Sequence, residues 1–140
     1  MSSSAAYVHL RPGGPLPPVL AQAPFRAIVV IDAEVSAHWR AEVSKWLIDC
    51  GCLYMLAWGC DCSLWDDSLD IANLESFGFG EIPEDKFVMT TWHAEEELAQ
   101  VFWFSRNCAS HPAVELERTV IFHISDGERE NEFIAMYQDA

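Results

Sequence analysis

Four short apolar runs alternate along the chain with segments of helical periodicity, and this alternation restricts the possible folds more than any other feature. A short apolar run rich in β-branched residues is typical of a buried strand, whereas apolar residues at every third or fourth position are typical of a helix with one buried face. The predicted strands are 27–31, 53–58, 86–90 and 119–124. The predicted helices are 35–50, 64–76, about 92–108 and about 128–137.

An alternating order of strands and helices favours a parallel sheet, because parallel strands need long crossover connections. The first strand, 27–31, is apolar at every position, as expected where helices cover both faces. We therefore predict an α/β fold: a small three-layer α/β/α sandwich with a four-stranded, mostly parallel sheet in β-α-β-α-β-α-β-α order. With strands numbered along the chain, the sheet orders 2-1-3-4 and 3-2-1-4 both fit. An antiparallel edge position for the second strand is a less favoured alternative.

The first part of the chain differs from the rest in composition, with serines at 2–4 and prolines and glycines between 12 and 18. Proline removes backbone donors and glycine adds conformational freedom, so we predict a flexible N-terminal arm over residues 1–24. The remaining residues, 25–140, are predicted to form a single α/β domain, because a chain of this length suffices for one hydrophobic core.

The chain is strongly acidic: 22 acidic side chains against 8 basic ones give a net charge of −14. The basic residues are scattered and form no stripe, so direct binding to a nucleic-acid backbone is not expected. An acidic surface attracts basic partners, and we therefore expect the partner to be another protein, a basic one if the acidic surface binds it. We predict no cofactor.

Hydropathy and cysteine count indicate the compartment. The longest apolar run is far shorter than the ~20 residues of a membrane-spanning helix, and no signal peptide is evident at the N-terminus. We therefore expect no association with a membrane. The five cysteines are an odd number, which favours free thiols in a reducing cytoplasm over a disulfide framework.

Polar side chains follow each predicted strand, most densely after the second, where Cys60, Asp61 and Cys62 stand before a helix. The carboxyl ends of parallel strands meet at one edge of a sheet, and open α/β folds bind their ligands there. The alternative explanation is that these residues only cap helices and form turns. The polar residues expected at this edge are Asp32, Glu34, Cys60, Asp61, Cys62, Thr91, Trp92, His93, Ser125 and Asp126.

Three kinds of chemistry are considered for this edge. One is a magnesium or phosphoryl-transfer site at Asp32 and Asp126, although no basic residue or glycine-rich loop is there to hold a phosphate. A helix N-terminus stabilises a thiolate, so Cys60 or Cys62 would be the nucleophile, His93 its base, and a carboxylate from a neighbouring strand end would orient the base. The same three residues would also suit a metal, with Asp61 as a fourth ligand, but their spacing matches no recognised zinc motif, and we predict no metal. The catalytic candidates are Cys60, Cys62, His93, Asp61 and Asp126.

Several of these residues are also candidates for contact with a ligand or partner. A tryptophan at a strand end either stacks on a ligand, anchors a partner, or closes one end of the core. His123, inside the fourth predicted strand, is expected to be a core residue with satisfied hydrogen bonds. The candidates for ligand or partner contact are Asp32, Trp58, Trp65, Asp66, Asp67, Thr91 and Trp92.

Three segments carry a family resemblance. The sequence GCLYMLAWGCDCSLWDDS at 51–68, the sequence MTTWH at 89–93 and the aromatic triplet at 102–104 resemble a group of small uncharacterised bacterial proteins that share a domain of unknown function. The resemblance covers about residues 25–137, and it implies no activity, cofactor or site residue.

These observations lead to one principal hypothesis and two alternatives. The principal hypothesis is a small acidic cytoplasmic protein that acts as a protein-binding regulatory or immunity-type module and has no chemistry of its own, because no catalytic motif is complete. The first alternative is an enzyme, or a protein that binds a small ligand or metal, using the Cys/Asp/His cluster at the strand ends. The second alternative is homodimerisation through the same surface.

Overall fold

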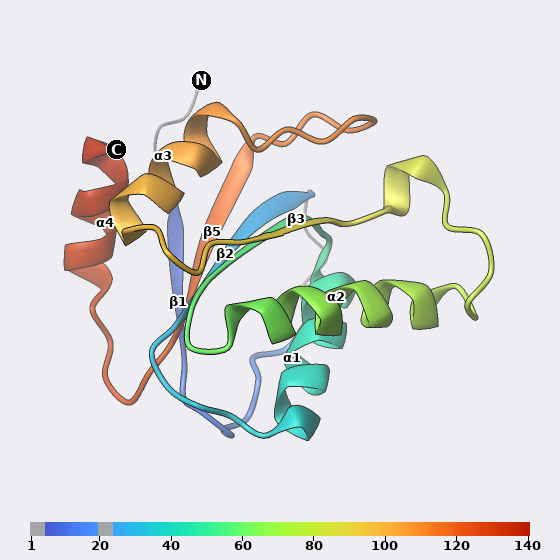
Figure 1. Ribbon diagram of the computed structural model, residues 1–140, viewed down its shortest axis with the longest axis horizontal. Helices are drawn as coiled ribbons and strands as arrows, with labels where there is room; N and C mark the ends of the chain where they lie inside the picture. The colour runs from blue at the N-terminus through green and yellow to red at the C-terminus, as the bar shows by residue number, and fades with distance from the viewer. Residues whose placement is uncertain (1–4, 20–23) are drawn as a thin grey trace.

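The computed structural model describes residues 5–19 and 24–140, and a parallel sheet forms the centre of this described part (Figure 1). The sheet has five strands in the order β1-β5-β2-β3-β4, and every neighbouring pair is parallel. β1 and β4 are therefore its edges, and β2 is central. The strands are β1 (Ala6–Leu10), β2 (Phe25–Ile31), β3 (Cys52–Gly59), β4 (Met89–Trp92) and β5 (Arg118–Ile124).

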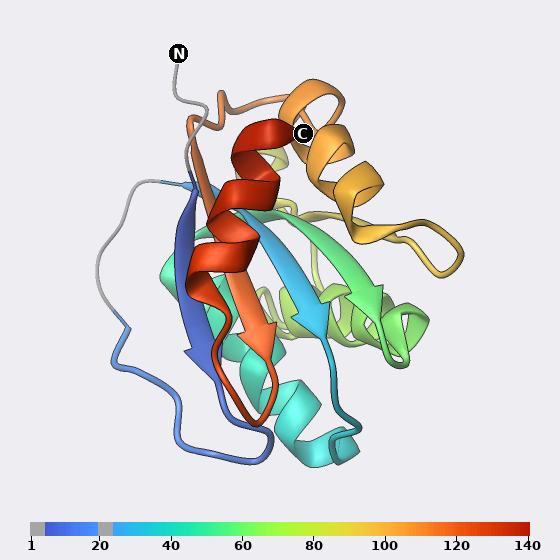
Figure 2. The same ribbon diagram turned by 90° about the vertical axis from the view of Figure 1, so that its left-hand side faces the viewer.

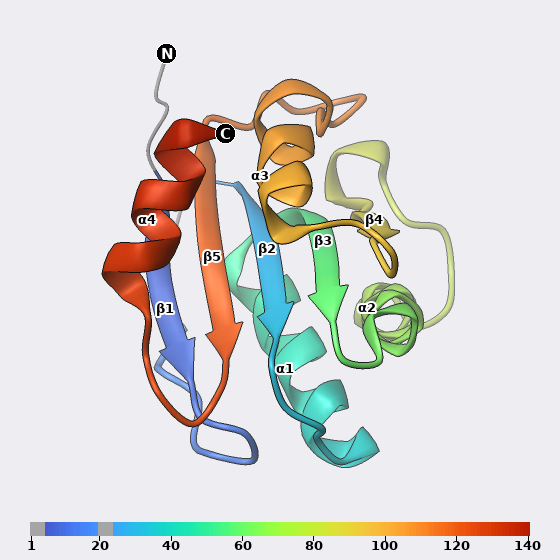
Figure 3. The same cartoon turned by 60° about the vertical axis from the view of Figure 1, so that its left-hand side comes forward.

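Helices cover both faces of the sheet, as Figure 3 shows. Helices α1 (Ala37–Cys50) and α2 (Cys62–Ser76) lie on one face, and α3 (Leu98–Asn107) and α4 (Glu130–Asp139) lie on the other. A short 3-10 helix, η1 (Glu84–Lys86), precedes β4. The predicted α/β/α sandwich is confirmed, with five strands instead of four. The four predicted strands take the order 3-2-1-4, and β1 is added beside the fourth.

The edge strand β1 corrects the prediction of a flexible arm over 1–24. Residues 6–10 pair in register with β5, with His9 opposite His123. Within this strand Tyr7 and His9 alternate with Val8 and Leu10. This two-residue period is typical of a strand with one polar and one apolar face. The arm prediction is therefore wrong for 6–10. Residues 1–4 and 20–23, which also belong to the predicted arm, lie outside the described residues.

The proline-rich segment that follows β1 packs against α1. The indole N–H of Trp39 donates a hydrogen bond to the carbonyl of Gly14 (2.9 Å), and that of Trp46 donates to the carbonyl of Pro17 (2.8 Å). Two helix tryptophans thus hold a segment that has few backbone donors of its own.

The third predicted strand and the helix after it are shifted along the chain. The strand β4 begins at Met89 rather than at residue 86, so Thr91 lies inside the strand and caps no helix. Helix α3 instead begins after Glu97, which forms a reciprocal capping box with Gln100. No helix among the described residues has both the length and the apolar character that a bilayer crossing requires.

The end of β3 approaches β2 so closely that only glycine fits at position 59. Gly59 has φ of 108°, and a Cβ atom there would lie 2.2 Å from the carbonyl oxygen of Ile31. The next residue, Cys60, donates its backbone N–H to that same oxygen at 2.9 Å. Gly59 therefore allows the turn after β3 to lie against the end of the central strand.

We expect Gly59→Ala to lower the free energy of unfolding by about 3 kcal/mol, because the added methyl group meets backbone rather than a movable side chain and the residue keeps a positive φ. Chemical denaturation followed by circular dichroism measures the change. Gly127→Ala is the matched control, since a Cβ at position 127 meets no atom within 4 Å, and it should change stability by less than about 1 kcal/mol. Equal effects in the two variants would contradict this account of Gly59.

Candidate functional site

The carboxyl ends of β2 and β5 meet where the chain leaves these two neighbouring strands toward opposite faces of the sheet (Figure 2). β2 continues to α1 on one face, and β5 continues to α4 on the other. In open α/β sheets such a switch point leaves a crevice that receives ligands. Asp32 follows β2 and Ser125 follows β5, and the backbone N–H of Asp32 donates to the carbonyl of Ile124 (2.9 Å).

A chain of hydrogen bonds runs from Asp32 at this switch point through the core. Nε2 of His123 lies 2.5 Å from Oδ2 of Asp32, and Nδ1 of His123 lies 2.7 Å from the hydroxyl of Tyr7. The same hydroxyl accepts the backbone N–H of Arg129 at 2.9 Å. A neutral imidazole with its proton on Nε2 satisfies the whole chain: Arg129 donates to Tyr7, Tyr7 donates to His123, and His123 donates to Asp32.

His123 and Asp32, the two partners of the 2.5 Å contact, differ in burial. His123 is fully buried against the ring of Phe133, whereas the Asp32 side chain is 34% exposed. Burial also raises the pKa of Tyr7, and the nearby carboxylates of Glu128 and Glu130 raise it further, so Tyr7 remains a proton donor over the physiological range. Asp32 is thus a solvent-facing carboxylate that is held in one orientation from behind.

The turn after β3 lies at the same edge and is also acidic. The carboxylates of Glu34 and Asp61 and the thiol of Cys60 have ligand atoms within 4.8 Å of one another, the group of potential metal ligands found among the described residues. Asp61 precedes α2 in a left-handed conformation, with φ of 54°, and its side chain forms no capping hydrogen bond. Partial burial raises the pKa of Cys60, and the charges of Asp61 and Glu34 raise it further.

The structure separates the three residues that the sequence analysis grouped as a catalytic or metal-binding cluster. Cys62 is buried at the start of α2, on one face of the sheet. His93 is buried against Phe104 of α3, on the other face, where its ring nitrogens bond Thr91 Oγ1 (2.9 Å) and Glu96 Oε1 (2.8 Å). Neither residue joins the acidic group at Cys60. The predicted grouping of His93 with Cys60 and Cys62 is therefore wrong, because β3 and β4 continue to opposite faces of the sheet.

The remaining candidates divide into buried and exposed residues. Trp58 donates its indole N–H to the carbonyl of Glu96 (2.7 Å), and Trp65 is buried edge-on against Trp39. Asp66 is buried, and its Oδ1 atom has no hydrogen-bond partner among the described residues. The exposed candidates are Asp67, Trp92 and Asp126.

A second surface of functional interest lies at the β4 end of the sheet. Eight large apolar residues of the described chain are exposed, and six of them lie on α2, on the connection from α2 to β4, or on β4 itself (Figure 1). We call these six the β4-end surface. They are Leu64, Ile71, Leu74, Phe79, Phe87 and Trp92.

A family model described as Domain of unknown function (DUF7684) matches residues 5–140. The chain belongs to this family. The match includes β1, in agreement with the structure, so the DUF7684 domain begins before residue 25. Comparisons with curated proteins and with solved structures found no match. The resemblance to a domain-of-unknown-function family is thus confirmed, and it brings no activity.

Two residues of this candidate site were not recognised in the sequence. Tyr7 was assigned to the arm, although the alternation of polar and apolar residues over 6–10 was a usable strand signal. His123 was expected to be a satisfied core residue, and it is one, but nothing in the sequence indicates that Asp32 satisfies it. That pairing depends on β2 and β5 being neighbours, which the sequence left open.

The raised pKa of Cys60 in the DUF7684 chain predicts slow alkylation near neutral pH, because a smaller fraction of the thiol is ionised there. Asp61→Asn removes a negative charge beside the sulfur, lowers the pKa and should make alkylation of Cys60 faster at the same pH. Peptide mapping by mass spectrometry after iodoacetamide pulses measures the rate at this one cysteine. Glu75→Gln, at the far end of α2, is the charge-matched control and should leave the rate unchanged.

Proposed function

We propose that this protein binds a basic protein partner through the β4-end surface. The observation that carries the proposal is the gathering of six of the eight exposed large apolar residues of the described chain at one end of the sheet. Exposed apolar residues are ordinary when they are scattered, but gathered ones are characteristic of protein interfaces. Trp92 and the two phenylalanines supply the aromatic side chains that such interfaces favour.

The strand at this end of the sheet favours an interface as well. β4 is an edge strand whose neighbour in the sheet is β3, so one of its sides is open to a further chain. Helix α2 lies beside it: Asn73 bonds the backbone N–H of Val88 (2.9 Å), and Asp70 accepts the hydroxyl of Thr90 (3.1 Å). These contacts hold the apolar residues of α2 next to the edge strand.

The charge around the β4-end surface defines the partner. Residues 62–97 contain ten carboxylates and one lysine, and so they carry nine of the fourteen excess negative charges of the chain. Protein–protein interfaces commonly have an apolar centre and a charged rim. The charge of the rim favours partners of opposite charge. A second copy of this chain would bring like charge to the contact, which disfavours homodimerisation. A segment that combines apolar and basic side chains fits both features.

A small acidic protein with such a surface suits a regulatory or immunity-type role, in which it binds and occupies a basic protein. We place this role in the cytoplasm, and the odd number of cysteines, five, supports that assignment because thiols persist in a reducing compartment. Recognition needs no catalysis by this chain, and its charge accelerates the encounter with a basic partner.

A titration with designed peptides tests the proposal. An amphipathic helical peptide of leucine and lysine is the probe, with a leucine–glutamate peptide and a lysine–glutamine peptide as comparisons. We expect the leucine–lysine peptide to bind most tightly, and Trp92→Ser with Ile71→Ser to weaken it by about tenfold or more, as loss of an anchor residue does. Affinity should fall as salt rises from about 50 to about 500 mM, because the rim contacts are screened.

The matched control for this titration is Trp103→Ser. Trp103 on α3 is 52% exposed, as Trp92 is, but it lies on the opposite face of the sheet. Its loss should leave binding unchanged. Equal binding of the leucine–glutamate peptide, or equal weakening by Trp103→Ser, would overturn the proposal.

A second candidate function is the binding of a small cationic ligand at the switch point, and the anchored carboxylate of Asp32 favours it. A carboxylate held from behind by His123 is oriented before a ligand arrives, and Glu34 and Asp61 stand at the same edge. This arrangement suits an ammonium or guanidinium group. The chain has no glycine-rich loop after β2, and so the switch point does not suit a phosphate.

Nuclear magnetic resonance titration of the labelled chain with arginine, putrescine and choline tests this second candidate. We expect saturable shifts at residues 32–34 and 60–62, and a loss of about tenfold in affinity in Asp32→Asn, because the charged acceptor is lost. Asp139→Asn, at the other end of α4, is the control. Shifts that are equal in both variants would show that the cations only sample the acidic surface.

A further inference from the structure

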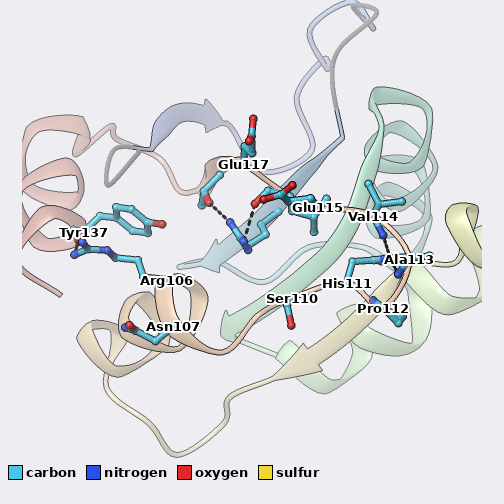
Figure 4. A pocket seen from close by; sticks show the side chains of 13 residues that line it. Arg106, Asn107, Ser110, His111, Pro112, Ala113, Val114, Glu115, Glu117 and Tyr137 are labelled. Atoms are coloured by element: carbon cyan, nitrogen blue, oxygen red, sulfur yellow. Dashed lines mark hydrogen bonds between the residues drawn. The ribbon is translucent and has the colours of Figure 1, made fainter. Parts of the chain in front are cut away.

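A cavity of about 1070 Å³ opens at the amino ends of the strands, at the opposite end of β2 from Asp32 (Figure 4). Its walls come from the end of α3, the connection from α3 to β5, the first residues of β2 and β5, and Tyr137 of α4. The volume is in the range of small-molecule sites. Two of the eight basic residues of this acidic chain, Arg26 and Arg106, line it.

The guanidinium of Arg26 is fixed by neutral oxygen atoms. Its Nε donates to the carbonyl of Ala109 (2.7 Å), one Nη donates to the hydroxyl of Thr119 (3.1 Å), and the other Nη donates to the carbonyl of Leu116 (2.8 Å). A guanidinium has five N–H groups, so these three bonds leave two for a further acceptor. Arg26 is only partly exposed and cannot turn away without breaking the three bonds.

Arg106, at the end of α3, is also held by backbone oxygen atoms. One of its Nη atoms donates to the backbone oxygens of Ala140 (2.6 Å), Tyr137 and Gln138 (3.2 Å each), and its guanidinium carbon lies 5.6 Å from the centre of the Tyr137 ring. Figure 4 shows Arg106 directed toward Tyr137. Its Nε and second Nη lie outside these bonds to the protein.

No carboxylate side chain of the described residues forms an ion pair with Arg26 or Arg106, although the chain has 22 acidic residues. A partly buried cation without a counter-charge is costly, and carbonyl dipoles offset only a part of that cost. An anion bound in the cavity would offset the remaining cost of burying the charge, and the fixed guanidinium groups would bind it without rearrangement.

The loop that forms the cavity wall is itself fixed, so the cavity exists before any ligand binds. His111 is buried: its Nε2 bonds the carbonyl of Phe87 (2.7 Å), and its Nδ1 accepts the backbone N–H groups of Ala113 and Val114. One histidine therefore makes two bonds within the connection and ties it by a third to the chain before β4.

The other lining residues limit the size and charge of the anion. Val114, Leu116 and Pro112 provide apolar wall, while the exposed carboxylates of Glu115 and Glu117 repel a ligand of high negative charge. We infer that this cavity binds a small organic acid, a molecule with one oxyanionic group for the two arginines and an apolar body for the wall. Carboxylates and phosphate monoesters share this chemistry.

Titration of the labelled full chain with three related probes tests the inference by nuclear magnetic resonance. Phenylacetate carries a carboxylate, phenyl phosphate carries a phosphate, and phenylacetamide is their neutral counterpart. We expect saturable shifts over residues 106–117 with at least one of the two anions, at least about tenfold weaker binding in Arg106→Gln and in Arg26→Lys, and no shifts with the amide. The relative affinities of the two anions identify which oxyanion the cavity prefers.

Arg129→Gln is the charge-matched control, because Arg129 lies at the carboxyl edge and pairs with Glu132. It should leave both affinities unchanged. The inference is overturned if neither anion gives saturable shifts, if the amide binds as well as the anions, or if Arg129→Gln weakens binding as much as Arg106→Gln. Should Arg26→Lys fail to fold, Arg106→Gln decides alone, since its bonds lie at the end of α4 rather than within the sheet.

Discussion

The peptide group between Ile31 and Asp32 joins the three central strands, and most of the structure around the switch point depends on it. Its carbonyl oxygen, on Ile31, accepts the backbone N–H of Cys60 beyond β3, and its N–H, on Asp32, donates to the carbonyl of Ile124 on β5, both at 2.9 Å. The end of the central strand is therefore fixed on both sides. Residues 27–31 before it are buried to within 2% exposure, so the strand has no freedom to shift within the sheet.

Fixing this peptide also determines where the side chains at the edge can go. Asp32 emerges beside β5, and so its carboxylate meets His123, the residue paired with Val30 of the same central strand. On the other side, the turn at Gly59 brings Cys60 and Asp61 close to Glu34 and raises the pKa of the thiol. The acidic character of this edge disfavours the thiolate nucleophile that the cysteine-rich turn suggested. Reactivity of the thiol and orientation of the carboxylate thus have one structural origin.

The fold could be predicted from the sequence because its signals are local. The apolar strands and the helical stripes are each read from consecutive residues, and they sufficed for the parallel three-layer arrangement. β1 was missed because five residues beside a proline-rich segment give a weak signal, and most of the pairing that stabilises this strand comes from β5, over a hundred residues away. The helix at 98–107 was placed too early because Thr91, a residue type that often caps helices, lies inside a strand.

The candidate site was harder to predict because it depends on which face each connection takes. Residues that follow neighbouring strands can be buried on opposite faces of the sheet and then do not meet. Cys62 and His93 are separated in this way, whereas Asp32 reaches His123 within the neighbouring strand β5. Strand order alone therefore does not define a site in an α/β sandwich.

The distribution of charge separates the two binding surfaces of this chain from each other. Nine of the fourteen excess negative charges lie between residues 62 and 97, around the β4-end surface, whereas Arg26 and Arg106 line a cavity at the amino ends of the strands. A basic protein approaching the acidic rim is attracted at long range, but the arginines repel it from the cavity. A small anion experiences the reverse, since the exposed carboxylates exclude it from most of the surface and the fixed guanidinium groups receive it. Because the two proposed ligands have opposite charges and separate sites, the chain would be able to hold both at once, and occupancy of the cavity would leave the proposed protein interface open.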